Sequence, residues 1–282
     1  MAISDLHLSS AANRDALAAL PGFADDWLIV AGDVAERFDH LSLAFETFTR
    51  RFARVIWVPG NHELWSVPEQ DGQPPLRGAA RYLAQVALAR AFGVLTPEDP
   101  FAIWPGAGGP CVIAPLFLLY DYSFRPSAIA RQDVVAWATE QRSVCADEML
   151  LDSAPFASRE DWCASRLDWT EQRLQALDPS LPTVLINHFP LRDDLIHIPR
   201  APRFTPWCGT KVTADWHRRF RAQVVVSGHL HVRRTDWRDG CRFEEVSLGH
   251  PRQWNHAHGM ASYLRQILPP LTQNGVESTS AP

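Results

Sequence analysis

Short apolar runs of strand length alternate along the chain with longer segments of amphipathic pattern. Four runs stand out, at residues 27–31 (WLIVA), 54–58 (RVIWV), 183–186 (TVLI) and 223–226 (QVVV). Continuous apolar runs of this length are typical of strands that are covered on both faces. Amphipathic helices are predicted between them, for example over residues 40–52 and 76–92. The pattern therefore predicts a layered α/β fold.

One helix carries a clear start signal. Ser158 and Asp161 form a predicted capping pair, and the helix that they open runs to Leu177 before Asp178 and Pro179 end it. Its apolar residues recur at helical spacing, which indicates a face packed on the sheet rather than a cofactor site.

Two segments depart from the alternation of strands and helices. Residues 117–158 are rich in aromatic residues and arginine, and we interpret them as a small inserted cap on a domain spanning residues 1–268. Residues 269–282 (PPLTQNGVESTSAP) have the polar, proline-containing composition of a disordered tail.

Composition and charge exclude several classes of protein. With 282 residues, 46% of them hydrophobic, the chain can bury a large core. The formal net charge of −5 argues against a dedicated binder of duplex nucleic acid, although it allows a small anionic substrate. The sequence shows neither a membrane-spanning run nor a signal peptide, and its five cysteines form no C-x-x-C pair. We expect a cytoplasmic protein with reduced thiols and no membrane partner.

Candidate chemistry lies in five short motifs, each of which directly follows an apolar run. Since ligands gather at the carboxyl ends of strands in α/β sheets, motifs that are distant in the sequence can meet there. In chain order the motifs are Asp5-Leu6-His7, Gly32-Asp33, Gly60-Asn61-His62-Glu63, Asn187-His188-Phe189-Pro190 and Gly228-His229-Leu230-His231.

These motifs offer carboxylate, amide and imidazole ligands but no thiolate, a set that suits manganese, iron or zinc. Seven ligands exceed what one ion takes, so two ions with a bridging carboxylate are predicted. Residues two apart on an extended strand point the same way, so we expect Asp5 with His7, and His229 with His231, to face one cleft. The seven candidate ligands are Asp5, His7, Asp33, Asn61, His188, His229 and His231.

Any single motif has an alternative interpretation, a polar side chain satisfied by hydrogen bonds at a strand end. Gly-Asn-His and Gly-His-x-His are rare by chance, however, and the ordered set favours a metal cluster. His197 and His250 are further histidines that could join it.

The order D-x-H, GD, GNH(D/E), H and GHxH resembles the calcineurin-like metallophosphoesterase superfamily, from Met1 to between His231 and Gly249. The resemblance implies a four-layer α/β/β/α sandwich with a dinuclear metal centre, here with the inserted cap. It assigns Asp5, His7, Asp33 and His231 to one ion, and Asp33, Asn61, His188 and His229 to the other.

The same resemblance implies hydrolysis of a phosphate ester. Two close cations lower the pKa of a shared water and present hydroxide to phosphorus, with Asp33 bridging them. His62 would act as general acid, an effect of about 10² to 10⁴ in rate. Glu63 either orients the ring of His62 or is a surface or capping residue.

The substrate is predicted from residues outside the ligand set. Arg37 lies where related protein phosphatases place a phosphate-binding arginine. Tyr122 and Arg125 of the cap, with Trp207, could form a lid, which favours a small phosphomonoester, although aromatic residues are equally at home in a core. The alternatives are a phosphodiesterase or nuclease acting on nucleotides, or a member of the fold that is non-catalytic or hydrolyses a substrate other than a phosphate.

Overall fold

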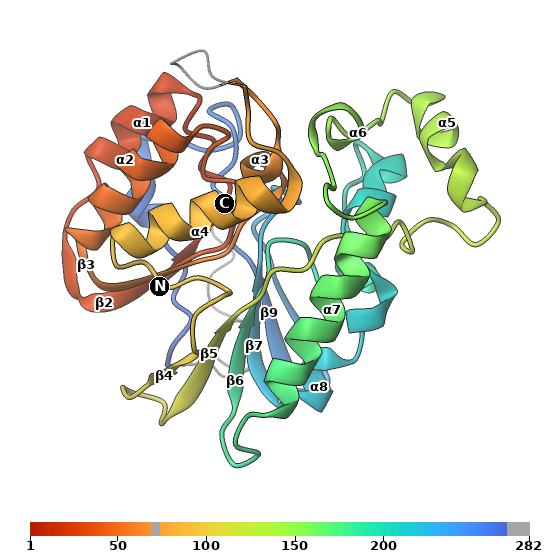
Figure 1. The fold of residues 1–282 in the computed structure, drawn as a ribbon. Helices are drawn as coiled ribbons and strands as arrows, with labels where there is room; N and C mark the ends of the chain where they lie inside the picture. The colour runs from red at the N-terminus through yellow and green to blue at the C-terminus, as the bar shows by residue number, and fades with distance from the viewer. Residues whose placement is uncertain (69–73, 270–282) are drawn as a thin grey trace.

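The predicted apolar strands belong to two sheets, in which β2, β6 and β7 are interior strands and β3 is an edge strand (Figure 1). The computed structural model describes residues 1–68 and 74–269. The smaller sheet is parallel with the order β1-β2-β3, and the larger has the order β4-β5-β6-β7-β9-β8, with antiparallel pairs at its two edges. The strands are β1 (Ala2–Ile3), β2 (Phe23–Val30), β3 (Phe52–Trp57), β4 (Ala102–Trp104), β5 (Cys111–Pro115), β6 (Thr183–Ile186), β7 (Ala222–Ser227), β8 (Thr235–Arg238) and β9 (Cys241–Glu245).

Helices cover the outer faces of both sheets, with α1, α2 and α4 beside the smaller sheet and α7 and α8 beside the larger one (Figure 1). The α-helices are α1 (Ala11–Ala18), α2 (Phe38–Thr49), α3 (Asn61–Leu64), α4 (Gly78–Ala91), α5 (Val134–Thr139), α6 (Asp147–Leu150), α7 (Arg159–Gln175) and α8 (Trp216–Arg219). The short 3₁₀ helices are η1 (Arg131–Asp133), η2 (Asp193–Leu195), η3 (Pro202–Trp207), η4 (Lys211–Thr213), η5 (His256–His258) and η6 (Met260–Tyr263).

The inner faces of the two sheets pack on each other. One buried apolar cluster joins Ile29 and Ile56 of the smaller sheet to Val184 and Val224 of the larger sheet. Alternate residues of the same strands, such as Leu28, belong to the second core under the helices. Because side chains alternate between the faces of a strand, each central strand is covered on both sides. The predicted α/β/β/α sandwich is confirmed.

The inserted segment begins as a buried stretch after β5 and carries α5 and α6, which project beside the amino-terminal end of α7 (Figure 1). The predicted cap of α7 is present, since the Ser158 hydroxyl accepts a hydrogen bond from the Asp161 backbone N–H at 3.0 Å. The limits of the cap and the domain stay predictions, and the predicted tail lies outside the described residues from residue 270 onward.

Two expectations from composition can be compared with the structure. All five cysteines are buried free thiols. None of the helices in the described part of the chain has the length and apolarity needed to cross a bilayer.

Candidate metal centre

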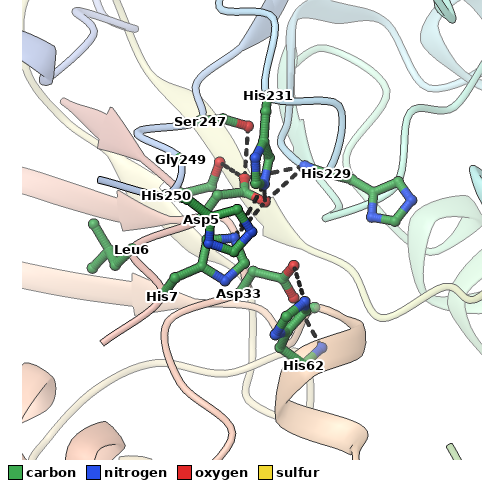
Figure 2. Close-up of polar contacts among 12 residues, drawn as sticks. Asp5, Leu6, His7, Asp33, His62, His229, His231, Ser247, Gly249 and His250 are labelled. Atoms are coloured by element: carbon green, nitrogen blue, oxygen red, sulfur yellow. Dashed lines mark hydrogen bonds and ion pairs between the residues drawn. The ribbon is translucent and has the colours of Figure 1, made fainter. Parts of the chain in front are cut away.

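The five motifs meet at one edge of the sandwich, where strands of both sheets end, and Figure 2 shows residues of four of them there. The smaller sheet supplies Asp5 and His7 after β1, Asp33 after β2, and Asn61 and His62 after β3. The larger sheet supplies His188 after β6, and His229 and His231 after β7. The site is therefore built across the interface between the two sheets.

The backbone at this edge is not extended. Strand β1 ends at Ile3 and β7 at Ser227, before the motifs begin. Extended strands are therefore not what brings these side chains together, although the side chains of Asp5, His7 and His231 do meet as expected. A left-handed backbone is costly for residues other than glycine, and such conformations gather at functional sites. Left-handed φ values occur at Asp5 (54°), His7 (42°), Asp33 (53°), His229 (74°) and His231 (54°).

Glycines precede three of the motifs because neighbouring groups leave no room for a side chain. A β-carbon on Gly60 would overlap the carboxylate of Asp33. One on Gly32, whose φ is +88°, would lie 2.6 Å from Nδ1 of His188. These glycines allow the loop after one strand to approach the ligands that follow another.

One group of candidate ligands surrounds His231. Its Nε2 lies 3.0 Å from Oδ1 of Asp5 and 3.1 Å from Nε2 of His7. Asp5 is fully buried, and its other oxygen accepts hydrogen bonds from the hydroxyls of Ser4 and Ser247. Asp5 thus keeps one oxygen directed toward the two imidazoles.

His250 joins this group, as one of the two further histidines predicted from the sequence. Its ring stacks on that of His7, with centroids 4.1 Å apart, and one ligand atom from each of His7, His231 and His250 lies within 4.8 Å of the others. His197, the other candidate, is exposed and is absent from the groups of possible ligands found among the described residues.

A second group surrounds Asp33. Nε2 of His188 lies 3.4 Å from Oδ2 of Asp33, and ligand atoms of Asp33, His188 and His229 all lie within 4.8 Å of one another. Nδ1 of His188 is held at 2.9 Å from the Ala31 carbonyl, which leaves Nε2 for the site. Among the described residues, Nε2 of His188, Nε2 of His229 and Oδ1 of Asn61 are buried without a hydrogen-bond partner.

Two carboxylate–imidazole pairs dominate the electrostatics. Burial is the largest single effect and disfavours the charged form of His188, but the charge and hydrogen bond of Asp33, with the charge of Asp5, together outweigh it and raise the pKa of His188 to about 10. In the same way, Asp5 raises the pKa of His231 to about 9 against the effect of burial. Both carboxylates have pKa values below their usual range because of these neighbours.

The other two imidazoles stay neutral. Burial and the neighbouring His62 lower the pKa of His7 to about 3. Burial and His188 likewise lower the pKa of His229 to about 3. Both residues therefore offer a nitrogen lone pair at neutral pH, as a metal ligand requires.

His62 lies beside Asp33 but is held by a residue that the sequence analysis did not single out. Its Nδ1 lies 2.7 Å from Oε1 of Glu36, and its Nε2 lies 3.8 Å from Oδ2 of Asp33. Burial lowers the pKa of His62, but Asp33 and Glu36 together raise it above the usual value. His62 is therefore suited to carry a proton at this edge of the site.

Glu63 does not contact the ring of His62. It is fully buried and accepts hydrogen bonds from the backbone N–H groups of Asp33, Val34 and Gly60 at 2.9, 2.6 and 2.7 Å. The first of the two roles considered for it is wrong, and the helix-capping role is confirmed by the capping box at the start of α3.

A cavity of about 240 Å³ opens onto the candidate ligands. His7, Asp33, His62 and other site residues line it. The rest of its described lining is an apolar wall formed by Trp65, Val144, Cys145, Ala146 and Phe204. Val144, Cys145 and Ala146 belong to the segment interpreted as a cap, which stays a prediction.

The residues predicted to contact substrate do not line this cavity. Tyr122 and Trp207 are fully buried, and both donate hydrogen bonds to Glu148 at 2.7 Å. Arg125 donates to carbonyls within its own loop, and Arg37 pairs with Asp39 at 2.9 Å. The two aromatic side chains are buried in the core, and the two arginines are held by a local ion pair and local hydrogen bonds. The geometry therefore gives no support to their predicted substrate contacts.

Comparison with known proteins agrees with this geometry. A family model of calcineurin-like phosphoesterases matches residues 1–233. The chain is 50% identical over 270 residues to the acyl-carrier-protein phosphodiesterase PptH of Mycobacterium tuberculosis, an alignment that covers 95% of this chain and 82% of that protein. The crystal structure of the phosphopantetheinyl hydrolase PptH from Mycobacterium tuberculosis is similar, with a TM-score of 0.89, 48% identity and 95% of each chain covered. The chain therefore belongs to the calcineurin-like phosphoesterases and is a metal-dependent hydrolase of phosphate esters.

Proposed function

We propose that the site holds two divalent ions. The donor set supports this, because a carboxamide oxygen of Asn61 and imidazole nitrogens of His188 and His229 are buried at the site without hydrogen-bond partners among the described residues. Asp33 is grouped both with His188 and His229 and with His7, as a bridging ligand would be. One ion would be held by Asp5, His7, Asp33 and His231, and the other by Asp33, Asn61, His188 and His229. When bound, such a pair activates water and neutralises phosphoryl oxygens.

We further propose that the substrate is a phosphodiester, which replaces the small phosphomonoester favoured by the sequence analysis. The cavity carries this conclusion. Its lining residues in the described part of the chain include no arginine or lysine. A monoester has one more negative charge than a diester and therefore calls for such a cation. A diester needs none, and the relative that is 50% identical is itself a phosphodiesterase.

The proposed substrate is an acyl carrier protein that bears a phosphopantetheinyl group, as the names of the relatives indicate for those proteins. In the proposed reaction the oxygen of water forms a bond to phosphorus, and the bond from phosphorus to the carrier-protein serine oxygen breaks. His62 donates its proton to that leaving oxygen, and Glu36 holds the imidazole in position. The products are the unmodified carrier protein and phosphopantetheine.

The apolar wall of the cavity fits the rest of this substrate. In a phosphopantetheinyl group, the phosphate is esterified to a CH₂ group, and the carbon after it carries two methyl groups. Trp65, Val144 and Phe204 would receive this part while the histidine side faces the phosphate.

The experiment is incubation of a phosphopantetheinylated acyl carrier protein with the chain and Mn²⁺, followed by mass spectrometry of the intact carrier. We expect loss of the phosphopantetheinyl group and no loss with the Asp33→Asn variant. A chain that cleaves bis(para-nitrophenyl) phosphate but leaves the carrier intact would contradict the carrier as substrate. A clear preference for para-nitrophenyl phosphate over its bis ester would restore the monoester interpretation.

A further inference from the structure

A buried carboxylate of the inserted segment contacts the candidate metal centre from behind. Asp147, the first residue of α6, is fully buried. Its Oδ1 lies 2.9 Å from Nδ2 of Asn61 and 2.6 Å from Nε1 of Trp65, so it accepts a hydrogen bond from each. Residues far apart in the sequence are thus joined through one oxygen atom.

The contact with Asn61 determines which end of its amide faces the site. A carboxylate only accepts hydrogen bonds, so it holds the NH₂ end of Asn61. The Oδ1 end has no hydrogen-bond partner among the described residues, and it is the end that could bind a cation. The reverse orientation would place two N–H groups toward the site, where they could not act as a ligand. Groups that orient a ligand from behind contribute to metal affinity.

The contact with Trp65 bears on the proposed general acid. The ring of Trp65 packs on the imidazole of His62, with centroids 3.7 Å apart and an angle of 31° between the planes. Since the indole N–H is held by Asp147, the ring cannot rotate away from His62 without losing that hydrogen bond.

Within the inserted segment, the side chain of Asp147 interacts with the Cys145 thiol but pairs with no cation among the described residues. Its side chain takes part in no ion pair found among the described residues, whereas its neighbour Glu148 pairs with Arg159 at 3.0 Å. A buried carboxylate without a cationic partner is costly, because two neutral donors replace only part of its hydration. Placed behind Asn61, its charge is a benefit when a cation is bound on the other side.

We propose that Asp147 is a positioning residue for the hydrolytic centre, which orients Asn61 toward the proposed ion and holds Trp65 against His62. The inserted segment then contributes a positioning residue to the centre, in addition to part of the lining of its cavity. This inference rests on the proposed dinuclear site.

The test compares two substitutions by titrating Mn²⁺ into metal-stripped protein in a calorimeter. Asp147→Leu removes the acceptor, and we expect Mn²⁺ affinity and kcat to fall about 10- to 100-fold while KM changes little. Asp147→Asn keeps one oxygen that can accept hydrogen bonds from both Asn61 and Trp65. We therefore expect its Mn²⁺ affinity and its kcat to lie within a few-fold of the wild-type values.

The matched control is Glu148→Gln, which changes the next residue of the same helix. Glu148 accepts hydrogen bonds from Tyr122 and Trp207 and does not contact Asn61. We expect this variant to unfold at a lower temperature yet to bind Mn²⁺ as wild type does. A purely structural role for Asp147 would give the Leu variant the same behaviour as this control.

Two results would overturn the proposal: wild-type Mn²⁺ affinity in Asp147→Leu, or an Asn variant as impaired as the Leu variant. If the Leu variant does not fold, Asp147→Glu provides the test. It keeps the charge but displaces the acceptor by one methylene, so we expect weakened Mn²⁺ binding, and wild-type affinity would refute the proposal. Binding of fewer than two ions by the wild-type protein would instead contradict the dinuclear centre, whatever the variants do.

Discussion

At the scale of single residues, the protonation of two histidines links metal binding to pH. His231 and His188 have pKa values of about 9 and about 10, so both carry a proton at neutral pH when they face their carboxylate partners. An imidazolium nitrogen cannot bind a cation, and each must therefore lose a proton when it becomes a ligand.

We expect Mn²⁺ binding at neutral pH to release about two protons per chain, because ligands that are protonated in the free protein exchange them for the ion. The apparent affinity should accordingly rise with pH until the pKa of His188, about 10, is reached, and the rise should be less steep above the pKa of His231, about 9. Calorimetry in buffers of different ionisation enthalpy measures the number released. Release should fall to about one proton in a His231→Gln variant, and binding without proton release would contradict the assignment of both histidines.

The contact between Glu36 and His62 leads to a second prediction on pH. A general acid works while protonated, so kcat/KM for a diester should fall as pH rises through the pKa of His62. The negative charge of Glu36 helps to raise that pKa, and in Glu36→Gln the descending limb of the profile should move to lower pH.

The measurement is kcat/KM for the phosphopantetheinylated acyl carrier protein against pH at saturating Mn²⁺, because its serine oxygen needs a proton in order to leave. His62→Ala is the reference for complete loss of the acid and should lower kcat by about 10² to 10⁴. An unchanged descending limb in Glu36→Gln would show that His62 is not the group that titrates.

The candidate ligands could be predicted from the sequence because each lies in a motif directly after an apolar run. Glu36 and Asp147 could not, since their roles depend on where loops fold back. Glu36 lies in the run GDVAERF, in which the family resemblance indicated Arg37 as a functional residue and gave no signal for Glu36. The structure pairs Arg37 with Asp39 and directs Glu36 to His62.

At the scale of helices and strands, apolar runs identified β2, β3, β6 and β7 and left the other strands undetected. Strand β6 has the predicted bounds, and β3 begins two residues earlier than predicted. Strand β9 is fully buried, but the charged residues of its sequence CRFEE conceal it from a search for apolar runs. The carboxylate of Glu244 is paired at 3.3 Å both with Arg242 of the same strand and with Arg265, which lies further along the chain. The pairing with Arg265 depends on the tertiary fold, which local periodicity does not detect.

Glu63 connects two of these elements, the loop after β2 and the start of α3. In Glu63→Gln an NH₂ group replaces one of two oxygens that face backbone N–H donors. Leaving a buried donor unpaired costs about 1–3 kcal/mol, so we expect a loss of this size in the free energy of unfolding of the metal-stripped protein. Urea denaturation measures it.

The control for Glu63 is Glu46→Gln, which removes only an exposed ion pair with Arg50 and should change the stability by less than about 1 kcal/mol. Equal stability of Glu63→Gln and wild type would show that the hydrogen bonds to Asp33 and Gly60 do not hold the two loops together.

At the scale of the whole molecule, the candidate centre joins the two sheets. The smaller sheet presents Asp5 and Asp33, and the larger sheet presents His188 and His231. The apolar layer between the sheets could be predicted, because continuous apolar runs indicate strands that are covered on both faces. The order of the strands within each sheet could not be predicted, because it depends on strand pairing, which the sequence pattern does not contain. Ions held by ligands from both sheets would cross-link the sandwich at this edge.

Bound ions should therefore stabilise the entire domain. For one site at an ion concentration of 100 times Kd, linkage gives about 2.7 kcal/mol, and a second ion adds to it. In a domain of this size each kcal/mol raises the unfolding temperature by about 2–4 °C. We expect chelation to lower the unfolding temperature of wild type accordingly and Mn²⁺ to restore it.

The Asp33→Asn variant tests whether this stabilisation depends on the proposed bridging charge. In Asp33→Asn, most of the increase in unfolding temperature that Mn²⁺ produces should disappear. Ser158→Ala provides the comparison, because loss of the cap on α7 costs about 1 kcal/mol at a position outside the candidate ligands, and its Mn²⁺ increment should equal that of wild type. An increment that survives intact in Asp33→Asn would mean that the ions bind without joining the two sheets through this carboxylate.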